Sequence, residues 1–395
     1  MRGGCFSLAL CILFPVTGLY GELPGDAARE YAVRLARGLD DRQLAAQVLL
    51  TGIDGAGVLE DSMKALLNRI PAGGIVLFKY NLSVERNQIA PFLESAAAAA
   101  SVRGILPEGG VTIPPFIAAD HEGGMVHRFD RGVGRLSAPA VYWEMAVARG
   151  WDLALEYVES TARRSGREIR ALGLTLNLAP VAEPLTEKNR DFLGSRSYGP
   201  DPRFVERAAA AFIRGMEEGG VSCAVKHFPG NTGVDPHEKT VVLDADREEL
   251  DVMIAPMAAL IRAGIPAVMV SHTLVPAWDS GHIASLSPRV IQTWLREELG
   301  FTGVVLADDF SMGAAASART PEDAVVEALN AGVDMTIAWP GNLASIHGAV
   351  LKALEEGRLS RARLEEAAGR ILYEKIRRGL IAAGREETGD GAGNQ

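Results

Sequence analysis

Residues 221–237 read VSCAVKHFPGNTGVDPH and combine an apolar run with several groups that can bind or transfer protons. Lys226 and His227 end the apolar run, and a turn rich in proline and glycine leads to Asp235 and His237. A short apolar run bounded by turn residues predicts a buried strand. In parallel α/β folds, reactive groups gather just past the carboxyl ends of such strands. We therefore predict that this segment supplies acid/base chemistry.

Other apolar runs of the chain also end in polar side chains. They lead into the segments IAADHEGGMVHRFD, NRDFLGSRSYGPDP, MVSHT and GVVLADDFSMG. One polar residue at a strand end is easily a satisfied core group, but polar residues at six or so consecutive strand ends are hard to explain by packing. The joint pattern predicts an active site. Its candidate residues outside the first segment are Asp120, His121, Glu122, Arg128, Asp191, Arg196, Ser271, His272, Asp308 and Asp309.

These residue types suit a ligand that is rich in hydroxyl groups. Carboxylates accept hydrogen bonds from hydroxyls, whereas lysine and arginine donate to them. Asp308 follows an apolar run, and an ionised carboxylate there can attack an anomeric carbon or stabilise an oxocarbenium ion. The pair of Asp235 and His237 can supply the proton, because an imidazole titrates near neutrality and a neighbouring carboxylate orients it.

The elements that must position these residues alternate between strands and helices. Helical spacing is seen over residues 26–47 and between most of the strands, and the region from Leu343 to Leu380 predicts amphipathic helix outside the barrel. The pattern predicts one α/β domain over residues 26–382, folded as a (β/α)8 barrel. A doubly wound sheet is the alternative, disfavoured because no glycine-rich dinucleotide loop follows the first strand. The predicted strands are Val48–Ile53, Gly74–Lys79, Pro115–Asp120, Leu174–Ala179, Ser222–His227, Ala267–His272, Gly303–Asp308 and Asp334–Trp339. The predicted helices between them include Val84–Ser101, Trp151–Leu172, Asp201–Gly219, Asp246–Ala263, Pro288–Leu299 and Pro321–Ala331.

Composition narrows the class of protein. The chain has 395 residues, a formal charge of −10 and 48% hydrophobic residues, which supports a sizeable core. The acidic balance and the lack of a basic run argue against a nucleic-acid surface. Of three cysteines, Cys5 and Cys11 lie near the N-terminus. Both lie within the stretch interpreted below as a leader, so Cys223 alone remains in the mature chain, and we expect it to be a small buried hydrophobe.

The two ends of the sequence differ from its body. Arg2 precedes the apolar stretch CFSLALCILFPVTGLYG, which is typical of a signal peptide or an uncleaved anchor over residues 1–21. We expect export to the periplasm or cell envelope, with lipid attachment at Cys11 as a weaker possibility because Leu10 is bulky. The polar, glycine-rich residues 383–395 predict a disordered tail.

The segments IAADHEGGMVHRF, GSRSYGPDP, AVKHFPGN…DPH, MVSHTLVPAWD and GVVLADDFSMGA together resemble glycoside hydrolase family 3. Within it they resemble the single-domain β-N-acetylhexosaminidases of the NagZ type, from about Leu49 to Leu380. The resemblance implies a retaining exo-acting β-N-acetylglucosaminidase that removes terminal GlcNAc from peptidoglycan fragments or chitooligosaccharides. It implies no metal or other cofactor, and we expect a monomer whose partner is the glycan.

The resemblance also implies roles for single residues. Asp308 matches the nucleophile that forms a covalent glycosyl-enzyme, His237 the mobile-loop general acid/base, and Asp235 its partner. The loop is about two residues shorter than is usual and carries Pro236 within the pair, which makes it stiffer. Met125 stands where an arginine is common. The residues that match those holding the hydroxyls of the terminal sugar are Asp120, Arg128, Arg196, Lys226 and His227.

Three alternatives remain open. The first is a β-glucosidase or β-xylosidase of the same family. The second is a zinc hydrolase, disfavoured because no ligand follows the first strand. The third is a sugar-binding barrel without turnover, supported by the shortened loop alone. Asp309 is interpreted as supporting the site or capping a helix near Ser311, and His272 as a possible site-lining residue. We expect structural roles for His121, His127, His282 and His347.

Overall fold

Within the described residues, eight parallel strands close into a barrel in the order β1-β13-β12-β9-β7-β6-β5-β2. The computed structural model describes residues 25–105, 110–129, 131–235, 241–311 and 319–382. Each predicted strand is found, so the predicted (β/α)8 barrel is confirmed. The strands are β1 (Leu49–Gly52), β2 (Gly74–Leu77), β5 (Phe116–Ala119), β6 (Leu176–Asn177), β7 (Ser222–Phe228), β9 (Ala267–Val270), β12 (Val304–Ala307) and β13 (Met335–Ala338).

The strands are apolar along their whole length because both of their faces are covered. The four residues of β1, and likewise those of β2, β5, β9, β12 and β13, are all buried. The barrel closes because β1 pairs with a strand on each side. Leu50 of β1 aligns with Gly74 of β2 and with Ile337 of β13. Cys223 in β7 is fully buried and unpaired, as predicted.

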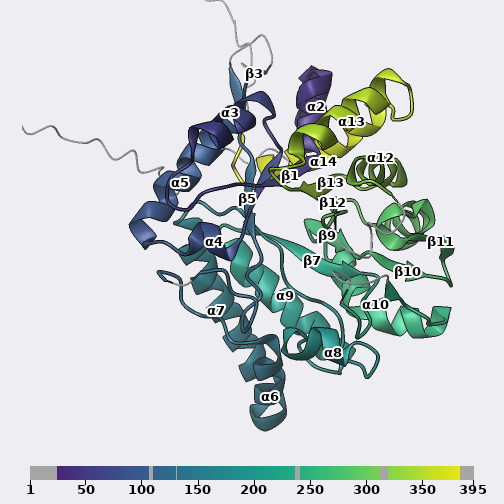
Figure 1. The fold of residues 1–395 in the computed structure, drawn as a ribbon. Coiled ribbons are helices and arrows are strands. Elements are labelled where there is room, and N and C mark those ends of the chain that lie inside the picture. Colours follow the sequence, from purple (N-terminus) through teal and green to yellow (C-terminus); the bar gives the residue numbers. More distant parts are fainter. Residues whose placement is uncertain (1–24, 106–109, 130, 236–240, 312–318, 383–395) are drawn as a thin grey trace, which may run out of the picture.

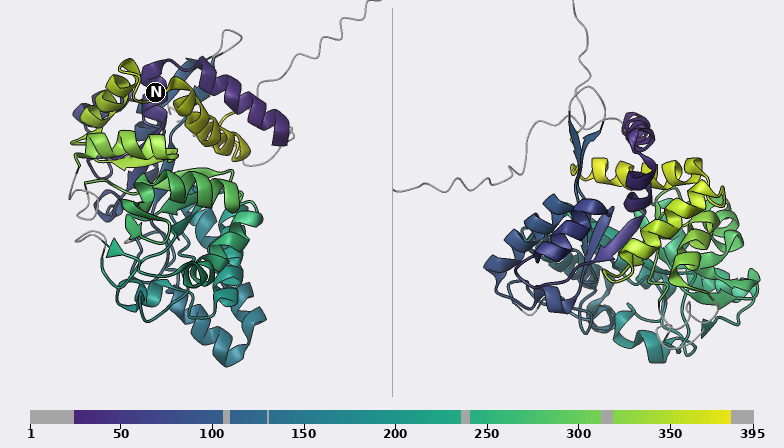
Figure 2. Two further views of the ribbon diagram at one scale, coloured as in Figure 1. Left: turned by 90° about the vertical axis from the view of Figure 1, so that its right-hand side faces the viewer. Right: turned by 45° about the horizontal axis from the view of Figure 1, so that its top comes forward.

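Helices surround the barrel (Figures 1 and 2). The predicted helices between strands are present, with ends within a few residues of those expected. The helices are α1 (Gly25–Gly38), α2 (Asp41–Gln47), α3 (Asp61–Arg69), α4 (Lys79–Leu82), α5 (Arg86–Ala99), α6 (Pro139–Arg149), α7 (Trp151–Arg170), α8 (Arg190–Leu193), α9 (Pro202–Glu218), α10 (Arg247–Arg262), α12 (Pro321–Ala331), α13 (Leu343–Glu355) and α14 (Arg361–Arg377).

Two predicted helices differ from expectation. The helix predicted over residues 26–47 is two helices, because Asp40 begins a new one: its side chain accepts from the Gln43 backbone N–H at 2.8 Å, and the Gln43 side chain accepts from the Asp40 N–H at 3.0 Å. The predicted helix Pro288–Leu299 is a π-helix over Arg289–Glu298, and the N–H of Leu299 bonds to the carbonyl of Trp294, five residues earlier.

Two small sheets were not predicted. β3 (Val102–Ile105) and β4 (Val111–Ile113) form an antiparallel pair before β5. β8 (Val241–Val242), β10 (Thr273–Val275) and β11 (Asp279–Ile283) form a three-stranded sheet, in which Thr273 aligns with Val241. Strands of two to five residues have too short an alternation for periodicity to detect. Through β8, the second sheet fixes residues 241 and 242, which follow the segment that carries Asp235.

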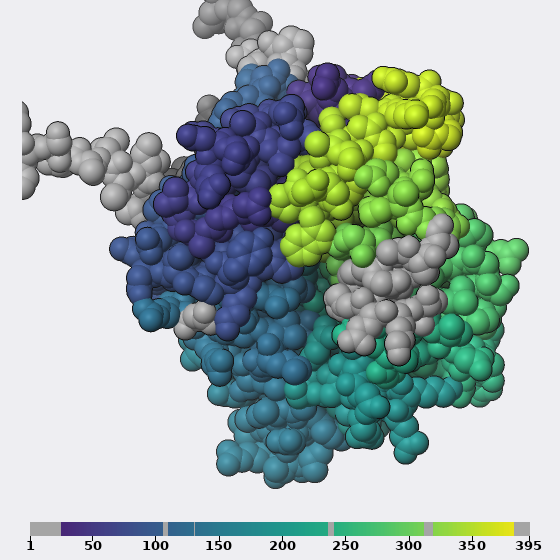
Figure 3. All heavy atoms as spheres, viewed as in Figure 1, coloured from purple at the N-terminus to yellow at the C-terminus, as the bar shows by residue number. Residues whose placement is uncertain are grey.

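The C-terminal region confirms the predicted amphipathic helices on the outside of the barrel. Helix α14 packs against α1, so that helices from opposite ends of the chain adjoin on the surface (Figure 3). Within the described ranges, no helix combines the length and the apolar character needed to cross a membrane. The predicted leader over residues 1–21 and the predicted tail over residues 383–395 lie outside the described residues.

Candidate active site

Five ionised side chains meet at the carboxyl end of the barrel strands, and we call them the charged cluster: Asp120, Glu122, Arg128, Arg196 and Lys226. The Lys226 Nζ lies 2.6 Å from Asp120 Oδ1 and 2.7 Å from Glu122 Oε1. Arg128 donates to the second oxygen of Asp120 at 3.1 Å. Arg196 donates to both oxygens of Glu122, at 2.8 and 2.9 Å. The structure thus brings together four residues predicted to hold a sugar, and it adds Glu122.

Mutual pairing keeps the charged cluster ionised despite its burial. Burial alone would raise the pKa of Asp120, but Lys226 and Arg128 outweigh it and hold that pKa well below its usual range. At Glu122, burial would likewise raise the pKa, but Lys226 and Arg196 outweigh it and lower that pKa to about 2. Burial would lower the pKa of Lys226, but Asp120 and Glu122 raise it instead. The cluster therefore presents fixed charges at neutral pH.

A glycine turn brings Arg128 back toward Asp120. The N–H of Glu122 donates to the carbonyl of Val126 at 3.1 Å, which closes the turn. Gly123 has φ +102°, and a Cβ there would lie 2.2 Å from the Ser137 carbonyl oxygen. Only glycine fits such a left-handed, crowded position without displacing the backbone. Gly123 of the DHEGG segment therefore allows the turn that builds the charged cluster.

A break in the register of β7 explains why Lys226 and His227 both contact site residues although they are sequence neighbours. Lys226 aligns with Met269 and Phe228 aligns with Val270, so His227 is an extra residue in the pairing. The His227 Nδ1 lies 2.7 Å from Glu183 Oε1, and the His227 backbone N–H donates to the same oxygen at 3.1 Å. His227 is thus held by Glu183 rather than by the charged cluster.

The predicted proton-transfer pair is described only in part. Asp235 is partly buried at the end of the segment that follows β7. His237 lies outside the described residues, so the pairing of Asp235 with His237 stays a prediction. The start of the segment is well fixed, because the Asn231 backbone N–H and side-chain amide donate to Glu183 at 2.7 and 3.0 Å.

The predicted nucleophile Asp308 follows β12 directly. It is partly buried, and its Oδ1 accepts from the backbone N–H of Asp309 at 2.8 Å. The buried carboxylate of Asp309 accepts from the Ser311 N–H at 2.9 Å, from the Ser311 hydroxyl, and from the indole N–H of Trp339 after β13. Asp309 thus holds both Ser311 and Trp339. The residues that follow Ser311 lie outside the described ranges, so the predicted helix cap stays a prediction.

A cavity of about 540 Å³ touches both parts of this constellation. Arg128 lines it and pairs with Asp120, whereas Trp339 lines it and bonds to Asp309, next to Asp308. The Phe78 and Trp339 ring centroids are 4.7 Å apart in a stacked arrangement. A cavity of this size with aromatic walls and a few charged groups is typical of a small-ligand site. Its lining residues are Phe78, Lys79, Tyr80, Ser83, Arg128 and Trp339.

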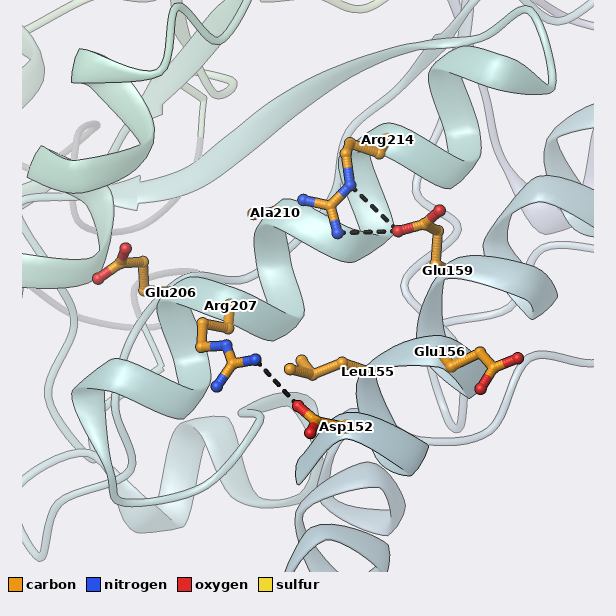
Figure 4. A pocket seen from close by; sticks show the side chains of 8 residues that line it. All are labelled: Asp152, Leu155, Glu156, Glu159, Glu206, Arg207, Ala210 and Arg214. Carbon is orange, nitrogen blue, oxygen red and sulfur yellow. Dashed lines mark hydrogen bonds and ion pairs between the residues drawn. The ribbon is translucent and has the colours of Figure 1, made fainter. Parts of the chain in front are cut away.

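A second hollow of about 420 Å³ lies between the outer helices α7 and α9, away from the strand ends (Figure 4). Its arginines are already paired, Arg207 with Asp152 at 3.3 Å and Arg214 with Glu159 at 2.8 Å. Because none of the strand-end residues lines it, we locate the active site at the first cavity.

The remaining histidines fit structural roles. His121 Nε2 bonds to Ser165 Oγ at 2.8 Å, and burial together with His127 lowers the pKa of His121 to about 3. His272 Nδ1 bonds to Ser285 Oγ at 2.7 Å, and its ring lies against Phe310, next to the end of β12. His282 bonds to Asp279, and His347 to the Arg42 carbonyl. Of the other candidates, Asp191 is exposed on α8, and Ser271 donates to the Gly230 carbonyl.

The sequence alone gave no role to Glu183, Trp339 or Asn231. It gave Glu122 as a candidate without a role. Glu183 and Trp339 each follow a barrel strand, so their position was a usable signal. Asn231 carried none, because turns after strands are commonly rich in asparagine. No three acidic, histidine or cysteine side chains among the described residues are arranged to ligate a metal.

Comparison with known proteins identifies the family to which the chain belongs. The model of the glycosyl hydrolase family 3 N-terminal domain matches residues 43–373. The beta-hexosaminidase of Methylococcus capsulatus is 33% identical over 321 residues, which are 80% of this chain and 89% of that protein.

Solved structures show the same fold. A family 3 beta-N-acetylglucosaminidase from Paenibacillus sp. matches with a TM-score of 0.78 and 31% identity, over 90% of this chain and 66% of that one. NagZ from Neisseria gonorrhoeae, in complex with N-trifluoroacetyl-D-glucosamine, matches with a TM-score of 0.69 and 27% identity, over 83% of this chain and 89% of that one. The charged cluster and Asp308 thus lie at the carboxyl end of the strands of a glycoside hydrolase barrel, and the chain belongs to glycosyl hydrolase family 3.

Proposed function

We propose that this glycoside hydrolase is a retaining, exo-acting β-N-acetylglucosaminidase that removes terminal GlcNAc from peptidoglycan fragments or chitooligosaccharides. The observation that carries the proposal is the cavity that touches the charged cluster through Arg128 and the neighbour of Asp308 through Trp339. The names of the relatives supply the sugar, since they are a beta-hexosaminidase and a beta-N-acetylglucosaminidase.

In this proposal the charged cluster holds the terminal sugar. The carboxylate of Asp120 accepts from sugar hydroxyls, while Lys226, Arg128 and Arg196 donate to them. These groups are already fixed by one another, at 2.6 to 3.1 Å. Little ordering is then needed when the sugar binds, which favours a precise pose of its anomeric carbon.

The reaction then proceeds in two steps. Asp308 attacks the anomeric carbon and forms a glycosyl ester, while the bond to the leaving oxygen breaks and the Asp235–His237 pair protonates that oxygen. Water next attacks the same carbon, the pair takes up its proton, and Asp308 leaves as a carboxylate. Two inversions give net retention of configuration.

Export to the periplasm or cell envelope belongs to the same proposal and rests on the composition of residues 1–21. A monomeric enzyme is proposed as well, because the cavity and the charged cluster both come from one chain. Neither feature changes the chemistry of the site.

The test is hydrolysis of three nitrophenyl β-glycosides, those of GlcNAc, glucose and xylose, by the purified protein. We expect nitrophenol release to be fastest from the GlcNAc compound, and proton NMR to show the β-anomer as the first product. Faster release from glucoside or xyloside would select the alternative specificity. Binding of GlcNAc without release from any of the three would indicate a non-catalytic barrel, and a first-formed α-anomer would exclude the covalent mechanism.

A further inference from the structure

Glu183 is a buried carboxylate that joins the end of β7 to the first turn of the segment that follows it. It follows β6, and its side chain is 5% exposed. One oxygen accepts from the backbone N–H and Nδ1 of His227 and from the side-chain amide of Asn231. The other accepts from the Asn231 backbone N–H at 2.7 Å. Both oxygens are therefore used, by a residue of β7 and by a residue of the segment that follows it.

This contact fixes which nitrogen of His227 carries a proton. Burial alone would raise the pKa of Glu183, but hydrogen bonds from His227 and Asn231 outweigh it and lower that pKa, so the group is ionised at neutral pH. An ionised carboxylate only accepts hydrogen bonds. Nδ1 of His227 must therefore be the donor, and Nε2 is the nitrogen left for a ligand.

The same carboxylate holds the first turn of the segment that leads to Asp235. Next to Asn231, the Gly230 carbonyl accepts from the hydroxyls of Ser271 at 3.2 Å and Thr273 at 3.1 Å. Thr273 also aligns with Val241 in the pairing of β10 with β8. The chain is thus anchored at residues 230 and 231 and again at residue 241.

We propose that Glu183 is a positioning residue, which sets the tautomer of His227 for the sugar and fixes the start of the segment that carries Asp235. It acts through His227 and Asn231 and does not touch the substrate. One carboxylate then couples the placement of a sugar hydroxyl to that of the proton-transfer group. The catalytic part of this inference rests on the proposed function, whereas the tautomer of His227 is independent of it.

Two substitutions of Glu183 distinguish the effect of losing its acceptor oxygens from the effect of losing its negative charge. Glu183→Met removes both acceptor oxygens at similar volume, and Glu183→Gln keeps one of them. Glu374→Met is the matched control, because Glu374 is also a buried glutamate that accepts from a strand residue, Ser222, at 2.7 Å, but at the opposite end of the barrel. Asn231→Ala removes the side-chain amide alone.

The first measurement is NMR of protein labelled with ¹⁵N in its seven histidines, with the His227 signals assigned by loss in His227→Gln. We expect wild-type His227 to show a protonated Nδ1 and, when neutral, an unprotonated Nε2. Glu183→Met should lose this fixed pattern and Glu183→Gln should retain it in part, whereas Glu374→Met and Asn231→Ala should keep it. An Nε2-protonated neutral ring in the wild type, or an unchanged pattern in Glu183→Met, would overturn the inference.

The second measurement is kcat and KM on the nitrophenyl glycoside that the wild type hydrolyses best. We expect kcat/KM to fall about 10- to 100-fold in Glu183→Met, with kcat and KM both affected, and about 3- to 10-fold in Glu183→Gln. Asn231→Ala should lower kcat more than it raises KM. If kcat/KM falls no further in Glu183→Met than in Glu374→Met, Glu183 has only a structural role. If the wild type hydrolyses nothing, the proposed function fails, and the NMR result still decides whether Glu183 sets His227.

Discussion

Ionised side chains are buried at both ends of the barrel, but the two sets differ in what they leave open to a ligand. At the amino end of the strands, Asp334 precedes β13 and is fully buried. Its carboxylate pairs with Arg296 at 2.6 Å and with Arg363 and Arg370 at 3.0 Å, and it accepts from the Val305 N–H. At the carboxyl end, the charged cluster uses similar pairs, but Arg128 also lines the cavity.

The difference lies in the elements that supply the partners. At the amino end the partners come from α14 and the π-helix, which pack against the barrel and cover the charges. At the carboxyl end they come from the last part of β7, which carries Lys226, and from short segments between the barrel elements, which leaves Arg128 facing the cavity. Similar ion pairs therefore stabilise the fold at one end and prepare a binding site at the other, as is general for this barrel. Substitutions at the two ends should separate activity from stability.

The largest expected effect is that of Asp308→Ala on activity. Removal of the nucleophile should lower kcat/KM for the nitrophenyl glycoside by about 1,000-fold or more, because no glycosyl ester can form. The free energy of unfolding should change by less than about 1 kcal/mol, since among the described residues the Asp308 side chain accepts its hydrogen bond from the neighbouring backbone N–H. Kinetics and urea denaturation check both. Activity close to that of the wild type would remove Asp308 from the mechanism.

Asp334→Asn should show the opposite pattern. The loss of one carboxylate charge removes the shared partner of three arginines, of which Arg363 and Arg370 keep an ion pair with Glu366. It should cost about 3 kcal/mol of unfolding free energy, measured by urea denaturation. For the folded variant, kcat/KM should stay within about twofold of the wild-type value. A loss of activity without a loss of stability would show that the amino end of the barrel takes part in catalysis.

The same aspartate predicts a pH dependence. Burial alone would raise the pKa of Asp334, but Arg296, Arg370 and Arg363 outweigh it and lower that pKa from its ordinary value of 3.8. The unfolded chain thus binds the proton more readily, so the contribution of Asp334 is complete above pH 3.8 and is lost as pH falls toward the folded pKa. Wild-type stability should fall in this range more steeply than that of Asp334→Asn.

The sequence was sufficient to predict the barrel and most of the charged cluster, because both depend on local patterns. Strands buried on both faces are continuous apolar runs, and the residues after them, such as Asp120 and Lys226, must meet at one end of a closed parallel barrel. The break at Asp40 was also detectable, since an aspartate followed by glutamine three residues later is a capping signature.

The rest depends on tertiary contacts that spacing does not specify. Glu183 and His227 are 44 residues apart, and their contact requires β6 and β7 to be neighbours with a break in register. Trp339 was predicted as the last residue of a strand, but its bond to Asp309 requires the ends of β12 and β13 to come together. Neither the partner nor the distance follows from one sequence.

Lys375 tests whether every buried charge at the amino end stabilises the fold. Its ammonium donates to Gln47 Oε1 at 3.0 Å and lies over the Phe116 ring, and burial lowers the pKa of Lys375 from 10.5 to about 7. Lys375→Met should therefore raise the unfolding free energy at pH 7, by about 2 kcal/mol, because it removes the cost of burying an amine whose hydrogen-bond acceptor is a neutral amide.

The sign of the pH dependence of Lys375 is opposite to that of Asp334. Between about pH 7 and 10.5 the unfolded chain binds a proton that the folded chain has lost, so wild-type stability rises with pH. The advantage of Lys375→Met should therefore be greatest at or below pH 7 and shrink toward pH 10.5. For Glu374→Gln, at the neighbouring position, the difference in unfolding free energy from the wild type should not change in this way between pH 7 and 10.5. A destabilised Lys375→Met variant at pH 7 would mean that Lys375 stabilises the fold as the arginines around Asp334 do.

The smallest expected effect is at the cavity wall. Trp339→Phe keeps an aromatic ring against Phe78 but removes the indole N–H that donates to Asp309. The loss of one hydrogen bond to a carboxylate next to Asp308 should lower kcat/KM about 3- to 10-fold. Trp294→Phe is the control, because Trp294 is buried against Trp278 with ring centroids 4.5 Å apart and does not line the cavity. It should lower stability with little change in kcat/KM. If both variants lose activity equally, the cavity wall has no special part in catalysis, and the contrast between the two ends rests on the charged cluster and Asp308 alone.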